Sequence, residues 1–215
     1  MKKILVTGFV PFNGQAVNPS ELLVKALEPP EGAELERLIL PVEFRGAGMA
    51  LEEAAGALHP DVLLSIGQAG NAPCLAVERV AVNLDSSLSA DGRTLLADNS
   101  GFAPVDEPIC PEGPAAYFSQ LPARALVEAL DAAGIPARVS YSAGTYVCNH
   151  VMYLGCRLAE RYGGMSSGFV HVPFLPEQLP GPNGEDGKYS LPFPEMLKGI
   201  QLILAELAKP ASTQR

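Results

Sequence analysis

The sequence lacks the features that mark membrane and nucleic-acid-binding proteins. It contains no uninterrupted apolar run of about 18 residues, the length that a membrane-spanning helix needs. Acidic residues outnumber basic ones by 24 to 15, which gives a formal net charge of −9. Binding to a phosphate backbone needs clustered Lys and Arg. We therefore expect no membrane span and no nucleic-acid partner, and instead a soluble cytosolic protein.

The cysteine pattern excludes two further classes. The chain has four cysteines and no C-x-x-C pair, so a zinc cluster or a thioredoxin-like motif is disfavoured. Cys148 and Cys156 are expected on one helix about 12 Å apart, too far for a disulfide. The apolar run that begins at Ile4 is too short for an export signal and is expected to be a core strand. Reduced thiols are therefore expected.

Phosphate-binding motifs are also missing. The loop Gly8–Gly14 has neither G-x-G-x-x-G nor Gly-Lys-Ser/Thr. Phe9 and Phe12 stand where a phosphate loop needs small residues. Paired aromatic rings favour a flat, neutral and compact ligand, although ordinary core packing would also explain them.

The elements that are present alternate between strands and helices. This order predicts one α/β domain over residues 1–215, with a mainly parallel sheet covered by helices on both faces. The segment 85–122 and the loop 180–187 are rich in Gly and Pro, and long irregular segments are usually functional or mobile. The predicted strands cover 3–7, 35–42, 61–66, 77–84, 138–142 and 168–172, and the predicted helices begin near 19, 47, 124, 147 and 194.

Cys148 is the first candidate catalytic residue. It follows a short predicted strand and a turn at Gly144, with Thr145 as the expected N-cap of a helix. Unpaired backbone N–H groups and the helix dipole in the first turn favour a thiolate. A thiolate there is a candidate nucleophile. The alternative is a small, buried and inert cysteine.

The three histidines differ in their value as a partner for Cys148. His150 is two residues away on the same predicted helix, where side chains diverge, so a structural role is expected. His59 precedes a proline at the opposite edge of the sheet. His171 lies near the carboxyl end of a strand, where ligands bind in such folds. The loops Gly8–Gly14 and Gly67–Gly70 and the turn before Cys148 are expected at that same edge, which favours His171.

Glu78 is the candidate third group, which would orient the imidazole and balance its charge. It interrupts the apolar alternating run 75–82. A carboxylate in such a run is costly to bury unless it is paired. An ion pair with a basic residue at a strand edge would explain Glu78 equally well.

Four motifs resemble those of the pyroglutamyl peptidase I family, also called pyrrolidone-carboxylate peptidases. They occur in the family's order and with similar spacing, and the resemblance spans essentially the whole chain. The motifs are Thr7–Gly14 with Asn18–Ser20, Glu78–Asn83, Ser142–Tyr153 and Phe169–Pro176.

The resemblance implies a fold and an activity. The fold would be a three-layer αβα sandwich with a mainly parallel, twisted central sheet, similar to phosphorylase and hydrolase folds. The activity would be that of a cysteine peptidase that releases N-terminal pyroglutamate from peptides through a thioester acyl-enzyme. The resemblance further implies a homotetramer that needs no metal, and we expect no cofactor and a cytoplasmic location.

The resemblance also implies residue roles. Its catalytic residues would be Cys148 as nucleophile, His171 as general base and acid, and Glu78 as the group that orients His171. Phe9 and Phe12 would sandwich the pyrrolidone ring, the backbone of Gln68 would hydrogen-bond the lactam, and Asn18 and Val147 would complete the substrate-binding site.

One position departs from the family pattern. The family has an arginine ten residues after its glutamate, and this chain has Leu88 there. Arg93 is the candidate replacement, from a different loop geometry.

Two other functions remain open from the residues themselves. A non-catalytic small-molecule binding protein would keep Phe9 and Phe12 but hold an inert Cys148. A nucleoside phosphorylase-like enzyme is disfavoured by the missing phosphate loop.

Overall fold

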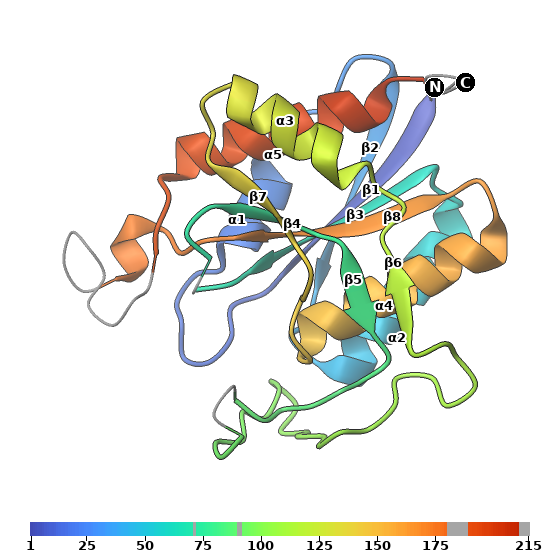
Figure 1. Ribbon diagram of the computed structural model, residues 1–215, viewed down its shortest axis with the longest axis vertical. Coiled ribbons are helices and arrows are strands. Elements are labelled where there is room, and N and C mark those ends of the chain that lie inside the picture. Colours follow the sequence, from blue (N-terminus) through green and yellow to red (C-terminus); the bar gives the residue numbers. More distant parts are fainter. Residues whose placement is uncertain (71, 90–91, 180–188, 211–215) are drawn as a thin grey trace.

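The computed structural model describes residues 1–70, 72–89, 92–179 and 189–210, and Figure 1 shows their arrangement around a twisted central sheet. The six-stranded sheet has the order β2-β1-β3-β8-β4-β7, and a two-stranded sheet pairs β5 with β6. The strands are β1 (Lys2–Phe9), β2 (Ala33–Leu40), β3 (Val62–Gln68), β4 (Leu75–Glu78), β5 (Val80–Val82), β6 (Ala116–Phe118), β7 (Ala137–Ser140) and β8 (Ser166–Val172). The helices are α1 (Pro19–Ala26), α2 (Phe44–Leu58), α3 (Ala123–Ala132), α4 (Val147–Tyr162), α5 (Phe193–Ala208) and the 3-10 turn η1 (Pro176–Gln178).

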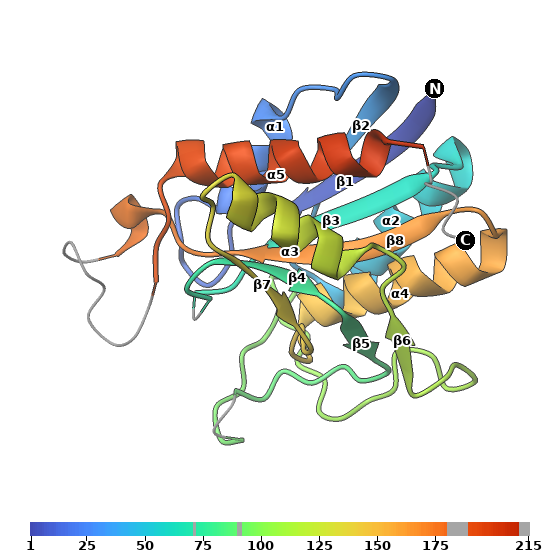
Figure 2. The same ribbon diagram turned by 45° about the horizontal axis from the view of Figure 1, so that its top comes forward.

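The helices cover both faces of the sheet, so the predicted three-layer α/β architecture is confirmed. Helices α1, α3 and α5 lie on one face and α2 and α4 on the other (Figures 1 and 2). The sheet is mainly parallel: β2, β1, β3 and β8 run in one direction, and β4 and β7 run in the other.

Strand alternation decides which side chains face each helix layer. On β8, Val170 and Val172 join the core beneath α1, α3 and α5, whereas Phe169 joins the core beneath α2 and α4. Because successive side chains point to opposite faces, His171 shares the face of Phe169. On β4, Leu75 and Val77 belong to the first core, which leaves Glu78 on the same face as His171.

The start of α1 follows the prediction from sequence. Asn18 is the N-cap, and its side-chain oxygen accepts hydrogen bonds from the backbone N–H and the hydroxyl of Ser20. Pro19 occupies the first helical position, where its missing N–H costs nothing.

The strand predicted over 77–84 is wrong as a single element, because it divides at Arg79. The Arg79 N–H still donates to Ser140 O beside the main sheet, while its carbonyl accepts from Ser119 N beside β6. Its guanidinium lies 5.0 Å from the centroid of the Phe118 ring on β6. The chain therefore leaves one sheet and enters another at this residue.

The start of α4 also differs from the prediction. Tyr146, not Thr145, is the N-cap, and it makes no side-chain capping bond. The Thr145 hydroxyl instead donates to Ser86 O at 3.2 Å, and Ser86 N donates back to Thr145 O at 2.8 Å. The Thr145 hydroxyl thus binds a distant segment of the chain instead of capping the helix.

Helix α2 begins three residues before its predicted start at Ala47. The backbone N–H of Phe44 donates to the carboxylate of Asp98 at 3.0 Å, so a remote side chain satisfies the first turn. This cap cannot be predicted from the local sequence, because Asp98 is 54 residues away from Phe44.

None of the helices that the structure describes is both long and apolar enough to cross a membrane. The loop predicted over 180–187 lies outside the described residues.

Candidate active site

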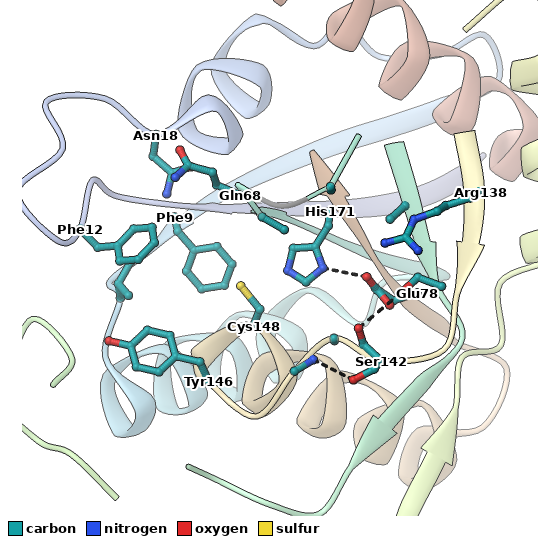
Figure 3. A pocket seen from close by; sticks show the side chains of 17 residues that line it. Phe9, Phe12, Asn18, Gln68, Glu78, Arg138, Ser142, Tyr146, Cys148 and His171 are labelled. Carbon is teal, nitrogen blue, oxygen red and sulfur yellow. Dashed lines mark hydrogen bonds and ion pairs between the residues drawn. The ribbon is translucent and has the colours of Figure 1, made fainter. Parts of the chain in front are cut away.

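A pocket with a cavity volume of about 460 Å³ opens on the sheet face that carries α2 and α4 (Figure 3). It brings together all of the predicted site residues except Val147 and Arg93. Glu78, Cys148 and His171 lie at its centre, and Phe9, Phe12, Asn18 and Gln68 lie toward one end.

His171 is held by a carboxylate. Its Nδ1 lies 2.8 Å from Oε1 of Glu78, and both side chains are almost completely buried. The other ring nitrogen faces the side of the pocket where the sulfur of Cys148 lies (Figure 3). The second Glu78 oxygen, Oε2, is buried and has no hydrogen-bond partner among the described residues.

The surroundings of His171 favour its protonated form. Burial lowers the pKa of His171, but the hydrogen bonds and negative charges of Cys148 and Glu78 outweigh burial and raise it to about 10. At neutral pH the ring is therefore an imidazolium. A cation beside a cysteine stabilises the thiolate form, which is the reactive one.

Cys148 reaches the pocket from the first turn of α4, as the sequence predicts. It packs closely against the sheet: a Cβ atom added at Gly67 would lie 2.9 Å from Cys148 Sγ and 2.6 Å from Phe169 Cζ. A side chain at residue 67 would therefore displace the sulfur or the ring. The glycine at this position makes room for both.

The route of the chain to Cys148 differs from the prediction. The carboxyl end of the strand before Cys148 was expected at the same edge of the sheet as the carboxyl end of the His171 strand. Because β7 runs antiparallel to β8, its carboxyl end instead points toward the opposite edge. The following turn lines the pocket through Ser142 and Gly144 and then leads to Cys148, with Gly144 in the left-handed region at φ 77°.

The apolar end of the pocket is built from aromatic side chains. Figure 3 shows the rings of Phe9, Phe12 and Tyr146 on the same side of Cys148. Phe9 is anchored against Phe169, with ring centroids 6.3 Å apart. The predicted pair of aromatic residues is therefore brought together next to the sulfur.

Asn18 and Gln68 border this aromatic end and are held by other contacts. The amide nitrogen of Asn18 donates to Val10 O at 3.1 Å, in addition to the capping role of its oxygen. The side-chain oxygen of Gln68 accepts from Gln178 Nε2 at 2.9 Å. Both side chains therefore shape the wall of the pocket through fixed hydrogen bonds.

Two predicted substrate contacts are not among the residues that line the pocket. Val147 is 1% exposed and packs in the core beneath α2 and α4, because the turn of α4 that presents Cys148 to the pocket directs Val147 inward. Arg93 is exposed and also lies outside the lining. The expected replacement of the family arginine by Arg93 stays a prediction.

Sequence reasoning missed Tyr146 and Arg138. Tyr146 donates its hydroxyl to Ala97 O at 3.0 Å while its ring lines the pocket. Arg138 lines the opposite end, from β7. Arg138 is paired with Ala76 of β4, which lies on the same face of the sheet as Glu78. Alternation would therefore have predicted Arg138 as a pocket residue if the pairing of β4 with β7 had been known.

The other two histidines lie away from the pocket lining. His150 Nδ1 lies 2.8 Å from Asp85 Oδ2 in a buried pair, a contact that suits the structural role expected for it. His59 ends α2 in a left-handed conformation.

In the part of the chain that the structure describes, no group of three or more His, Cys, Asp and Glu side chains has a metal-binding arrangement.

Comparison with known proteins gives a consistent family assignment. The family model described as pyroglutamyl peptidase matches residues 2–209. A pyrrolidone-carboxylate peptidase of Streptomyces coelicolor is 44% identical over 100% of this chain and 95% of its own length. One from Chromobacterium violaceum is 46% identical over 94% of this chain and 90% of its own.

Solved structures agree with the sequence matches. Pyroglutamyl peptidase I from Bacillus amyloliquefaciens superposes with a TM-score of 0.87 at 37% identity, covering 96% of this chain and 95% of that one. Pyrrolidone carboxyl peptidase from Thermococcus litoralis gives a TM-score of 0.86 at 36% identity, covering 95% and 92%.

Proposed function

The chain belongs to the pyroglutamyl peptidase family, and from that premise we propose that Cys148, His171 and Glu78 form its catalytic triad. The protein is a cysteine peptidase that removes N-terminal pyroglutamate. The observation that carries the triad is the position of His171, which is bound to Glu78 at 2.8 Å and interacts with Cys148 inside a pocket.

The pocket favours the pyroglutamyl ring over an ordinary N-terminus. Phe9 and Phe12 offer flat apolar surfaces, and neither Lys nor Arg lines that end of the pocket among the described residues. A lactam is neutral, whereas a free N-terminus carries a charge that is costly to desolvate. We infer that the ring lies between the two aromatic residues and that backbone groups at Gln68 bond its amide.

The first chemical step forms the thioester. The Cys148 thiolate attacks the carbonyl carbon that follows the lactam ring. The developing oxyanion lies at the N-terminus of α4, where backbone N–H groups of the first turn, including that of Cys148, are unpaired within the helix. His171 then donates its proton to the leaving amine as the C–N bond breaks.

The second step releases the product. His171, now neutral, removes a proton from water, and the resulting hydroxide attacks the thioester carbonyl. The C–S bond breaks, pyroglutamate leaves, and the thiolate and imidazolium are restored. Glu78 stays hydrogen-bonded to Nδ1 and stabilises the imidazolium in both steps.

The experiment that tests the triad measures hydrolysis of a pyroglutamyl amide reporter. We expect Cys148→Ala to abolish measurable turnover, while Cys110→Ala, a cysteine outside the pocket lining, keeps it. Alkylation should remove one fast-reacting thiol and the activity together. A fully active Cys148→Ala variant would contradict the role of Cys148 as nucleophile, whereas a wild-type protein that binds pyroglutamyl ligands without hydrolysing the reporter would support a pocket that only binds its ligand.

Three further properties are part of the proposal. Residues 1–215 form one catalytic domain, the active assembly is a homotetramer, and the protein works in the cytoplasm. The four unpaired cysteines support a reducing compartment. Light scattering on the purified chain tests the assembly, and a molar mass of one or two chains at working concentration would contradict it.

A further inference from the structure

The pocket continues past His171, away from the aromatic end. Arg138 lies at this second end (Figure 3), and Ala76 and Ser140, from the same two strands as Glu78 and Arg138, also line the pocket. If the pyroglutamyl ring lies beside Phe9 and Phe12, the scissile carbonyl meets Cys148 and the leaving amine lies near His171. The first residue of the leaving peptide then extends toward Arg138.

Arg138 is fixed on this face by strand pairing. In the parallel pair of β4 and β7, Arg138 is opposite Ala76, and Ser140 is opposite Glu78. Alternation therefore places Arg138 and Ser140 on the same face of the sheet as Glu78. Arg138 is exposed, and it is the only Lys or Arg that lines this pocket among the described residues.

The charge of Arg138 is available to a ligand. No carboxylate of the described residues forms an ion pair with it, and Glu78 is paired with His171. Its side-chain partner is Cys74, whose pKa is raised mainly by burial, so that thiol stays neutral and does not cancel the charge of Arg138. An arginine with this freedom is suited to binding a carboxylate through two parallel hydrogen bonds.

We propose that Arg138 determines specificity on the leaving side by binding a carboxylate of the residue that follows pyroglutamate. This inference rests on the proposed function. The carboxylate comes either from an acidic side chain at that residue or from the C-terminus of a pyroglutamyl dipeptide. The net charge of −9 repels anions at long range, so the preference arises from the local contact with Arg138.

The test compares four substrates that share the pyroglutamyl group: pyroglutamyl-Glu-amide, pyroglutamyl-Gln-amide, pyroglutamyl-Lys-amide and pyroglutamyl-Gln with a free carboxylate. We expect kcat/KM for the Glu amide to exceed that for the Gln amide by about three- to tenfold, and the Lys amide to be the poorest. A gain for the free acid over the Gln amide identifies the C-terminal carboxylate as the ligand. The preference should shrink as salt is raised, because the contact is exposed.

Variants assign the preference to Arg138. Arg138→Gln should bring the Glu and Gln amides to equal kcat/KM, and Arg138→Glu should favour the Lys amide. Arg138→Lys should keep part of the preference. Arg124→Gln, which removes an exposed arginine outside this pocket, is the matched control and should leave all ratios unchanged.

The outcomes separate this inference from the proposed function. Measurable turnover of the neutral Gln amide by Arg138→Gln shows that the variant is folded and that the triad works, and the ratios between substrates then report on Arg138. If both carboxylate substrates then keep their wild-type ratios to the Gln amide, Arg138 does not recognise the leaving group. Absence of turnover of every substrate by the wild-type protein would overturn both the function and this inference.

Discussion

Two histidine–carboxylate pairs lie on the same side of the sheet, and they have nearly the same geometry. His171 Nδ1 is 2.8 Å from a Glu78 oxygen, and His150 Nδ1 is 2.8 Å from an Asp85 oxygen. All four residues are buried. Distance and burial therefore do not distinguish the pair in the pocket from the pair outside it.

The pairs differ in what the second ring nitrogen contacts. His171 presents it toward Cys148 in the pocket (Figure 3). The Nε2 of His150 packs against α2, where a Cβ added at Gly48 would lie 2.8 Å from it. The ring of Phe44 meets His150 edge-on at a centroid distance of 5.9 Å.

The comparison separates two uses of the same pair. Asp85 begins the long segment that Thr145 and Tyr146 also hold against the start of α4, so the His150 pair fixes a loop to a helix. The His171 pair leaves one nitrogen free to exchange a proton with a nucleophile. Access to a reacting partner, rather than the carboxylate contact, distinguishes the candidate catalytic histidine.

The largest expected effect comes from replacing the histidine of each pair with asparagine. The asparagine amide can still donate a hydrogen bond near the position of Nδ1, but it has no group that replaces Nε2. His171→Asn should lower kcat/KM on a pyroglutamyl amide by about 10³- to 10⁴-fold, because the proton donor to the leaving amine is lost. His150→Asn, the matched variant, should stay within about tenfold of wild type while folded. Equal losses of kcat/KM in the two variants would show that His171 and His150 do not differ in their importance for catalysis.

The next effect concerns the carboxylate of the pocket pair. Glu78→Gln should lower kcat by about 10²- to 10³-fold, because the amide does not balance the imidazolium charge. The charge of Glu78 also raises the pKa of His171, so activity should fall at a lower pH in the variant.

The direction of this pH effect follows from the acid role. His171 donates its proton below its pKa of about 10 and loses that ability above it, so the alkaline limb of kcat/KM belongs to His171. A pH–rate profile measures the limb. Asp85→Asn is the control and should leave the limb in place, and a matching shift in that variant would contradict the assignment.

A smaller effect is expected on stability from the second pair. Asp85→Ala leaves the buried His150 nitrogen without its acceptor, which should cost about 1–3 kcal/mol. Thermal unfolding should show a lower Tm by about 2–12 °C for a chain of this size. Asp131→Ala, an exposed position on α3, provides the comparison and should change Tm little. An unchanged Tm in Asp85→Ala would show that the pair does not hold the segment.

The smallest effect is expected from Tyr146→Phe. Burial, with the charges of Asp98 and Cys148, raises the pKa of Tyr146 to about 12, so its hydroxyl remains a donor to Ala97 O. Losing that bond should cost about 0.5–1.5 kcal/mol, while the retained ring should keep kcat/KM close to wild type. A large loss of turnover with normal stability would instead assign the hydroxyl to substrate.

Much of the site could be predicted from sequence. Four motifs, including the segments of Glu78, Cys148 and His171, carried the family resemblance, and periodicity together with capping residues gave most element starts. Arg138 was missed because its facing depends on the pairing of β4 with β7. Arg93 lies outside the pocket lining, in a long irregular segment whose path is set by tertiary contacts that the sequence does not show.

Local chemistry follows from the sequence alone. Asn18 and Pro19 begin a helix wherever that segment lies, and the alternating apolar residues give buried strands. Tertiary structure alone decided strand direction, the division of 77–84 at Arg79 and the surroundings of each histidine. Those depend on pairing between residues far apart in the chain, which no local pattern encodes. His171 and His150 are similar as residues with carboxylate partners, and only the folded chain gives one of them a thiol to work with.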